Sequence, residues 1–251
     1  MIQFYSPDIE ETLRLPESDS QHCCRVLRMQ PGDTVTVVDG KGNSFLCRLL
    51  DNHTKHTAVA IERKEHVPLI WSNNITVMVA PTKHMDRMEW LVEKLVEIGV
   101  NRIVPVKCRF SERKDINRER LEKIAVSAMK QSLKATLPVI TEMTPLKQAV
   151  ETYDADQLFV GYCDKDTPRQ LLSHTYKADT DVNLLIGPEG DFSTDEIHFL
   201  LDKGYIPVTM GDNRLRTETA ALVAVTTCHI LNQLPHCNPA LFTMHSTPPF
   251  L

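Results

Sequence analysis

The sequence predicts an α/β protein in two parts: a small β-domain over residues 1–70, then a larger domain built on a parallel sheet over residues 75–234. The first part holds short apolar, β-branched segments without any long helical pattern. From Ile75 onward, strands and helices alternate, which is typical of a parallel sheet covered by helices on both faces. A chain of 251 residues can bury a core of that size.

The first part contains a strand pair around a turn. Thr34–Asp39 and Ser44–Leu50 are rich in apolar and β-branched residues, and Gly40–Asn43 between them has the composition of a hairpin turn. Thr57–Ile61 predicts a further strand. These strands together predict a small barrel. Val67–Asn74, which contains a proline, is the expected linker.

The second part begins with a strand over Ile75–Ala80 and a helix that should stop at Gly99, because glycine is favoured just past a helix end. Arg102–Lys107 is the next strand, and Thr217–Leu234 is a long apolar final helix. The other expected features are apolar helix faces formed by Met88, Leu91, Val92, Leu95 and Val96 and by Leu121, Ile124, Ala125 and Ala128, and strands over Pro138–Thr141, Gln157–Gly161, Val182–Ile186 and Ile206–Met210. Residues 235–251, rich in Pro and His, are expected to form an irregular tail.

The composition excludes several classes of protein. No apolar stretch approaches the roughly 20 residues of a membrane span, and the acidic N-terminus lacks the order of a signal peptide. Seven scattered cysteines without a C-x-x-C motif argue against a disulfide framework or a metal site and favour the cytoplasm. Because the net charge is −5, any nucleic-acid binding must rest on local basic patches.

The stretch "LLIGPEGDFSTDE" ends a predicted strand in a loop with little side-chain bulk. Gly187 and Gly190 allow close backbone approach to a ligand, and Ser193 with Glu196 forms an S-x-x-E capping box for the next helix. Ligands of open parallel sheets bind beyond the carboxyl ends of the strands. The chain has neither a P-loop nor a G-x-G-x-x-G motif, which argues against the usual nucleotide- and dinucleotide-binding sites. Taken alone, the loop is more typical of a tight strand–helix turn.

A second stretch, "MGDNRLRTETAALVAV", leaves another predicted strand in a similar way. Arg214 and Arg216 stand just before the last helix. A purely structural interpretation is open here: Arg216 would pair with Glu218 or Glu189, and Thr217 would cap the helix. Two such loops at the ends of strands in one sheet favour a binding site.

Together, "LLIGPEGDFSTDE" and "RLRTETAALVA" resemble the paired signatures of bacterial 16S ribosomal RNA uracil-N3 methyltransferases, members of the SPOUT class that modify uridine 1498. "HCCRVLRMQPGD" is similar to the PUA-like RNA-binding domain of that family, and "KHMDRMEWLVEKLVEIGV", "SERK" and "AMKQS" match its intervening segments. The resemblance implies a trefoil-knotted methyltransferase domain, S-adenosylmethionine as cofactor, no metal, 16S ribosomal RNA of the small subunit as substrate, and a cytoplasmic homodimer.

The resemblance also implies the site. Arg216 and Arg214 would stabilise the charge that develops on the uracil oxygens. The cofactor would lie against Gly161, Ile186, Gly187, Pro188, Glu189, Gly190, Met210, Gly211, Leu215, Arg216, Thr217, Glu218 and Ala220. The sequence departs from the family pattern twice: Asp191 stands where a second glycine is common, and the first arginine of G-x-R-I-L-R is displaced from Asn213 to Arg214.

RNA contacts are expected in two places. Residues 102–134 contain ten Lys or Arg and four acids, a local charge of +6 that is typical of a phosphate-contact surface. Within it, residues 117–123 are better explained as a solvated helix face with i,i+4 pairs. The expected RNA-binding residues are His22, Arg25, Arg28, Arg109 and Arg113. The alternatives are a non-catalytic RNA-binding or assembly protein with the same fold, or a SPOUT enzyme acting on a different RNA.

Overall fold

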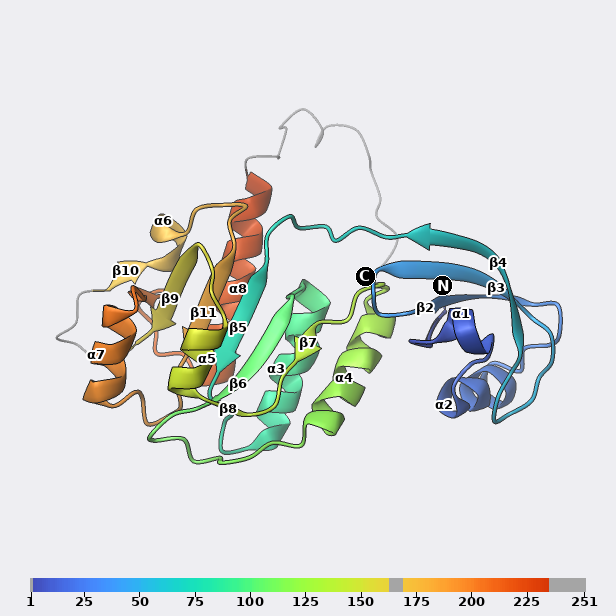
Figure 1. Ribbon diagram of the computed structural model, residues 1–251, viewed down its shortest axis with the longest axis horizontal. Coiled ribbons are helices and arrows are strands. Elements are labelled where there is room, and N and C mark those ends of the chain that lie inside the picture. The colour runs from blue at the N-terminus through green and yellow to red at the C-terminus, as the bar shows by residue number, and fades with distance from the viewer. Residues whose placement is uncertain (1, 163–168, 235–251) are drawn as a thin grey trace.

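The computed structural model describes residues 2–162 and 169–234. Figure 1 shows a small domain at one end of the molecule's long axis and a larger sheet-and-helix domain at the other. The expected tail over residues 235–251 lies outside the described residues, as do Cys163 and Cys237. Residues 67–74 connect the two domains.

The small domain is a four-stranded sheet in the order β1-β2-β3-β4. Its strands are β1 (Gln3–Tyr5), β2 (Thr34–Val38), β3 (Asn43–Leu49) and β4 (Val59–His66). The predicted hairpin is confirmed as the antiparallel pair β2–β3, whereas β4 starts two residues later than expected and runs five residues further. Leu15 N–H donates to the Thr57 carbonyl and Val59 N–H to the Leu13 carbonyl, so residues 13–15 pair with the start of β4. The closure of a barrel stays a prediction.

Short helices that the sequence did not indicate cover this sheet. They are α1 (Ile9–Thr12), α2 (Glu17–Gln21) and the π-helix η1 (His22–Val26). Each is too short to develop an apolar periodicity of its own. They matter because η1 carries His22 and Arg25.

The large domain is an eight-stranded sheet in the order β10-β12-β9-β11-β5-β6-β7, with β8 also paired to β6, and every pairing is parallel. Its strands are β5 (Ile75–Val79), β6 (Arg102–Lys107), β7 (Val139–Ile140), β8 (Thr144–Pro145), β9 (Gln157–Gly161), β10 (Gln170–Leu171), β11 (Val182–Ile186) and β12 (Ile206–Thr209). The six strands predicted from sequence are all present.

Helices cover both faces of the sheet, as predicted. They are α3 (Met85–Ile98), α4 (Arg118–Gln131), α5 (Leu146–Thr152), α6 (Leu172–Thr175), α7 (Thr194–Asp202) and α8 (Thr217–Gln233). One face packs against α3, α4 and α8, and the other against α5 and α7. All five residues of β11 are buried, because this strand lies between β5 and β9 in the middle of the sheet.

The two domains contact each other through the end of α4 and the chain that follows it. The Lys130 ammonium lies 2.5 Å from Asp19 Oδ1, and the Asp19 side chain is only 8% exposed. Gly42 N–H donates to the Ala135 carbonyl, and Leu137 N–H donates to the Gly40 carbonyl. The small domain is thus hydrogen-bonded to the large one.

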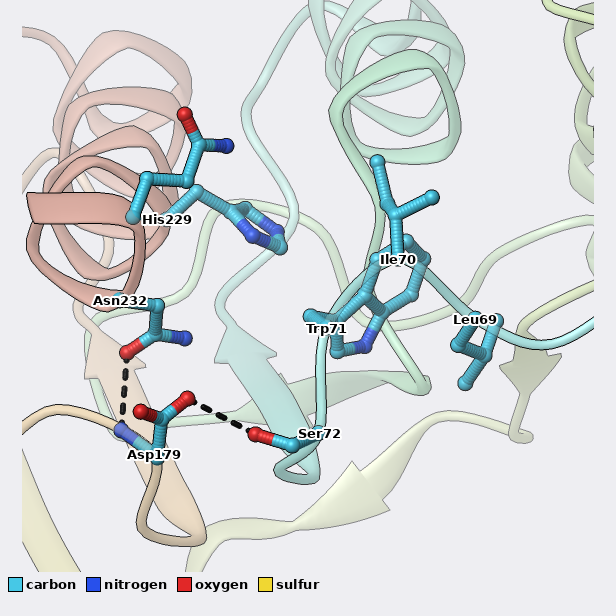
Figure 2. A pocket seen from close by; sticks show the side chains of 8 residues that line it. Leu69, Ile70, Trp71, Ser72, Asp179, His229 and Asn232 are labelled. Carbon is cyan, nitrogen blue, oxygen red and sulfur yellow. Dashed lines mark hydrogen bonds between the residues drawn. The ribbon is translucent and has the colours of Figure 1, made fainter. Parts of the chain in front are cut away.

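Polar side chains are gathered where the linker meets the end of α8 (Figure 2). His229 Nε2 donates to the Gly99 carbonyl at 2.7 Å and its ring meets the Trp71 ring edge-on. Asn232 bonds both Asn73 and Tyr176. A hollow of about 500 Å³ opens beside this network. It lies near the amino ends of β5 and β11, since Asn73 bonds Thr180 just before β11.

This network predicts a pH-dependent stability. Burial lowers the pKa of His229, although its bond to Gly99 acts in the opposite direction. The unfolded chain therefore takes up this proton at a higher pH than the folded chain, and stability is lost as the pH falls through the ordinary histidine range near 6.5. We expect the wild type to lose stability relative to His229→Gln between about pH 7.5 and about 5.5 in urea unfolding. Parallel pH curves for the two proteins would contradict this assignment.

Candidate functional site

Three loops meet at the carboxyl edge of the sheet, because β6, β5 and β11 are neighbours in that order. Lys83 N–H, in the loop after β5, donates to Glu189 Oε1 at 3.0 Å in the loop after β11. Arg113 Nε, in the loop after β6, donates to the Lys83 carbonyl at 3.1 Å. Hydrogen bonds thus join the three loops into one wall.

The glycine loop after β11 is shaped by close packing. A Cβ on Gly187 would lie 2.7 Å from the Phe192 ring, so only glycine lets that ring pack over the loop. This side of Gly187 is therefore filled by protein, and glycine there serves the packing. Asp191, where the family commonly has glycine, adopts φ 63°, a left-handed conformation that Asp tolerates better than most residues.

Thr217 joins the two sequence motifs. Its hydroxyl donates to the Gly187 carbonyl at 3.1 Å in a buried contact. The helix N-cap is Arg216, without a side-chain capping bond, so the suggested capping role of Thr217 is wrong. The start of α8 is instead hydrogen-bonded to the loop that leaves β11.

Glu218 pairs with a residue that the sequence reasoning missed. Its side chain is 8% exposed, and its Oε1 lies 3.8 Å from Arg87 Nε at the start of α3. Its Oε2 has no hydrogen-bond partner within the described ranges. The sequence signal for Arg87 was its place in "KHMDRMEW", directly after a predicted strand.

Arg214 and Arg216 are both exposed. Neither forms an ion pair with any residue of ranges 2–162 and 169–234. The structural interpretation that Arg216 pairs with Glu218 or Glu189 is therefore wrong: Arg87 occupies the first partner and the Lys83 amide the second. Both guanidinium groups are available to solvent or a ligand.

The other expected cofactor residues lie at neighbouring strand ends. A Cβ on Gly161, at the end of β9, would lie 2.9 Å from Ile186 Cδ1 and 3.3 Å from Met210 Cε, so these three residues are in contact. Gly211 follows with φ 130° and open space on its Cβ side. Pro188 is buried, Gly190 is exposed, and Leu215 and Ala220 are half-buried. The structure thus gathers the expected set along one edge, and their roles stay predictions.

The expected RNA-binding residues fall into two separate groups. His22, Arg25 and Arg28 are exposed on or just after η1 in the small domain. Arg109 and Arg113 lie in the loop after β6, where Arg109 is 3.6 Å from Asp195. In the segment around 117–123, Arg118 pairs with Glu122 and Arg120 with Glu89, which supports its interpretation as a solvated helix face.

The buried thiol beside this site is unsuited to catalysis. Burial raises the pKa of Cys108 to about 12, so the thiol stays protonated at neutral pH. Among the described residues, no three His, Cys, Asp or Glu side chains are grouped so that they could hold a metal ion. In the same part of the chain, no helix is long and apolar enough to cross a membrane.

Comparison with known proteins settles the family. A family model described as an RNA methyltransferase domain matches residues 71–229. The chain belongs to this RNA methyltransferase family. A second model, an RNA methyltransferase PUA domain, matches residues 15–62. The predicted fold class, a PUA-like domain preceding an α/β methyltransferase domain, and the predicted enzyme class are confirmed. The threading of a knot stays an expectation from the resemblance.

Individual relatives match this chain along most of their length. The Ribosomal RNA small subunit methyltransferase E of Rickettsia conorii is 26% identical over 213 residues, which cover 84% of this chain and 86% of that protein. A solved probable rRNA-methyltransferase from Porphyromonas gingivalis is 43% identical with a TM-score of 0.89, covering 94% of this chain and 100% of that one. The Neisseria gonorrhoeae Ribosomal RNA small subunit methyltransferase E, solved bound to S-adenosyl methionine, is 26% identical with a TM-score of 0.80, covering 92% and 98%.

The Thr217 bond predicts a measurable loss of stability. Thr217→Val keeps the side-chain shape but removes the donor to the buried Gly187 carbonyl, so we expect about 1–3 kcal/mol of destabilisation in urea unfolding. Thr217→Ser should stay close to the wild type. Thr226→Val is the matched control, because that hydroxyl only bonds the Leu222 carbonyl within α8. Equal losses in Thr217→Val and Thr226→Val would argue against a special role for the bond.

Proposed function

We propose that this protein transfers a methyl group from S-adenosylmethionine to N3 of a single uridine, at position 1498, in 16S ribosomal RNA of the small ribosomal subunit. The observation that carries the proposal is the buried bond between Thr217 and Gly187, which unites the two motifs shared with the family at one edge of the sheet. The names of the small-subunit methyltransferase relatives support the same substrate. From the resemblance, we further propose that it works as a cytoplasmic homodimer.

The residues along this edge suit S-adenosylmethionine. Leu215 and Ala220 offer half-buried apolar surface for the adenine ring. The backbone amides of the loop over residues 211–216, which begins with the positive φ of Gly211, would read the edge of that ring. The cofactor would also lie against the ends of neighbouring strands, where Gly161 packs against Ile186 and Met210. The cofactor would contribute an electrophilic methyl group on a sulfonium centre.

The chain's own contribution to the chemistry is orientation and charge. N3 of uracil becomes a nucleophile when a base takes up its proton, and the negative charge then spreads onto the ring oxygens. Arg216, with Arg214 beside it, would stabilise that charge with preorganised donors. A guanidinium stays protonated at working pH, so neither arginine serves as the base.

RNA recognition would use both groups of basic residues, of which only Arg113 is half-buried and the others are exposed. His22, Arg25 and Arg28 would contact the RNA backbone from the small domain, and Arg109 and Arg113 from beside the glycine loop. Because N3 lies on the Watson–Crick edge, the target uridine has to be unpaired or flipped out of its stack.

Loss of the gene tests the substrate directly. We expect mass spectrometry of ribosomal RNA from a deletion strain to show one methylated uridine missing from the small-subunit RNA, and a plasmid copy of the gene to restore it. Loss of a modification from another RNA would instead identify an enzyme of the same class with a different substrate. An unchanged set of modifications would favour the non-catalytic alternative.

Arg216 is expected to affect the reaction more than the fold. Because it has no ion-pair partner in the described ranges, Arg216→Ala should melt within a few degrees of the wild type. Its single-turnover methylation rate should fall by about 10²–10³, the usual effect of losing one such donor. Arg216→Lys should also be impaired, because lysine keeps the charge but loses the planar fork. A variant that melts early yet methylates at the normal rate when folded would contradict this role.

A further inference from the structure

A hollow of about 740 Å³ lies beside the glycine loop. It is lined by Phe110, Ser111, Glu112, Glu189 and Gly190. The first three residues come from the loop after β6 and the last two from the loop after β11. None of the first three is required by the site described above.

Phe110 is presented to this hollow by a rigid turn. Cys108 N–H donates to Ser111 Oγ at 3.0 Å, and Ser111 N–H donates back to the Cys108 carbonyl at 3.2 Å. Arg109 N–H donates to Glu196 Oε1 at 2.8 Å, which fixes the turn to the capping box of α7. The Phe110 side chain is nevertheless 49% exposed. The Arg109 guanidinium carbon lies 5.9 Å from the centre of this ring. A phenyl ring that is held by a hydrogen-bonded turn and stays half-exposed is prepared to pack against a further group.

The glycine loop approaches this ring closely. A Cβ on Gly190 would lie 3.3 Å from Phe110 Cβ and 3.6 Å from its carbonyl oxygen, so any larger residue would press on the turn. The backbone of Gly190 has an ordinary negative φ, and close approach is the reason for glycine here. The aromatic ring and the proposed cofactor loop therefore lie side by side.

The polar groups of the hollow match the edge of uracil. Glu189 uses Oε1 for the Lys83 amide, and its other oxygen accepts from no residue of the described ranges. An ionised carboxylate only accepts hydrogen bonds, and N3–H is the one donor on the Watson–Crick edge of uracil. Ser111 Oγ accepts from Cys108 N–H, and its hydroxyl, which also faces the Cys108 thiol, has one proton that a ring carbonyl can accept. An acceptor beside a donor is complementary to N3–H beside a carbonyl.

The charge distribution separates a base from a phosphate. Two carboxylates, Glu112 and Glu189, line the hollow, which disfavours a phosphate group inside it. Cations lie around it: Lys83 Nζ is 3.6 Å from Glu112, and Arg109 and Arg113 belong to the same loop. A neutral ring fits inside, while its phosphates fit the cations outside.

We propose that this hollow receives the extruded pyrimidine base of the RNA, with Phe110 as its stacking surface, Glu189 as the acceptor for N3–H and Ser111 as a donor to a ring carbonyl. This inference rests on the proposed function and adds the residues that hold the target. Single bases stack on exposed aromatic side chains throughout RNA recognition, and such a contact contributes strongly to binding.

The test uses small-subunit particles from a strain that lacks the gene, together with calorimetry of S-adenosylmethionine. Phe110→Leu keeps apolar volume but removes the ring face, so we expect kcat/KM on these particles to fall about 10- to 100-fold. Its affinity for S-adenosylmethionine and its melting temperature should not change. Phe110→Trp, which restores a stacking face, should recover most of the activity. Trp90→Leu is the matched control: Trp90 is also an exposed aromatic residue, but it lies on α3 and does not line the hollow.

Glu189→Gln tests the second contact, because the amide is nearly the same size but also donates. Because Glu189 also stands in the proposed cofactor loop, the rate is measured at saturating S-adenosylmethionine. We expect slower methylation there, and a wild-type rate under these conditions would overturn this part of the inference. An active wild type together with a fully active Phe110→Leu would overturn the inference alone. A wild type that methylates nothing in these particles would overturn the proposed function and the inference with it.

Discussion

The arrangement of the carboxyl edge depends on one buried hydrogen bond, from the Thr217 hydroxyl to the Gly187 carbonyl. The two residues are 30 positions apart, and the chain between them forms α7 and β12. A buried carbonyl that loses contact with water needs a donor, and α8 supplies it from its first turn. Because β11 is buried on both faces between β5 and β9, the loop that leaves it cannot shift to find another. The start of α8 is therefore positioned by a fully buried strand in the middle of the sheet.

Around this edge the acidic side chains have protein partners, whereas two arginines are exposed. The deepest acid, Glu218, is paired with Arg87, and Glu189 is engaged by a backbone amide. Arg214 and Arg216 remain exposed. An arginine without a protein carboxylate partner is free to pair with an anionic ligand. A buried acid without a partner would instead lower the stability of the fold. This division leaves two arginines without a carboxylate partner in the described ranges, and under the proposed function they would stabilise the anion that develops on uracil.

The sequence predicted the parts of the fold that obey a strong local rule. β6, β9 and β11 begin and end at the predicted residues, because continuous apolar runs mark strands that are buried in the middle of a sheet. The capping box of Ser193 and Glu196 was equally readable. The two-residue strand β10 and the short helices over the small domain were not, since they are too short to carry a periodicity.

The site could be predicted only where a motif ran along the chain. Its glycine loop and arginines follow strands directly, so their approximate position was evident from the sequence. The contribution of Arg87 depends on α3 lying against α8, and that of Phe110 on Gly190 meeting it from another loop. Such pairings arise from packing between distant segments, and no local pattern indicates them.

The linker also contacts a distant segment, at Gly99. A Cβ there would clash with the Trp71 ring, so this ring lies directly on the backbone at the end of α3. Together with the Lys130–Asp19 pair, this contact fastens both the linker and the small domain to the large domain. Under the proposed function, the enzyme then selects RNA whose folded shape already reaches the contact surfaces of both domains.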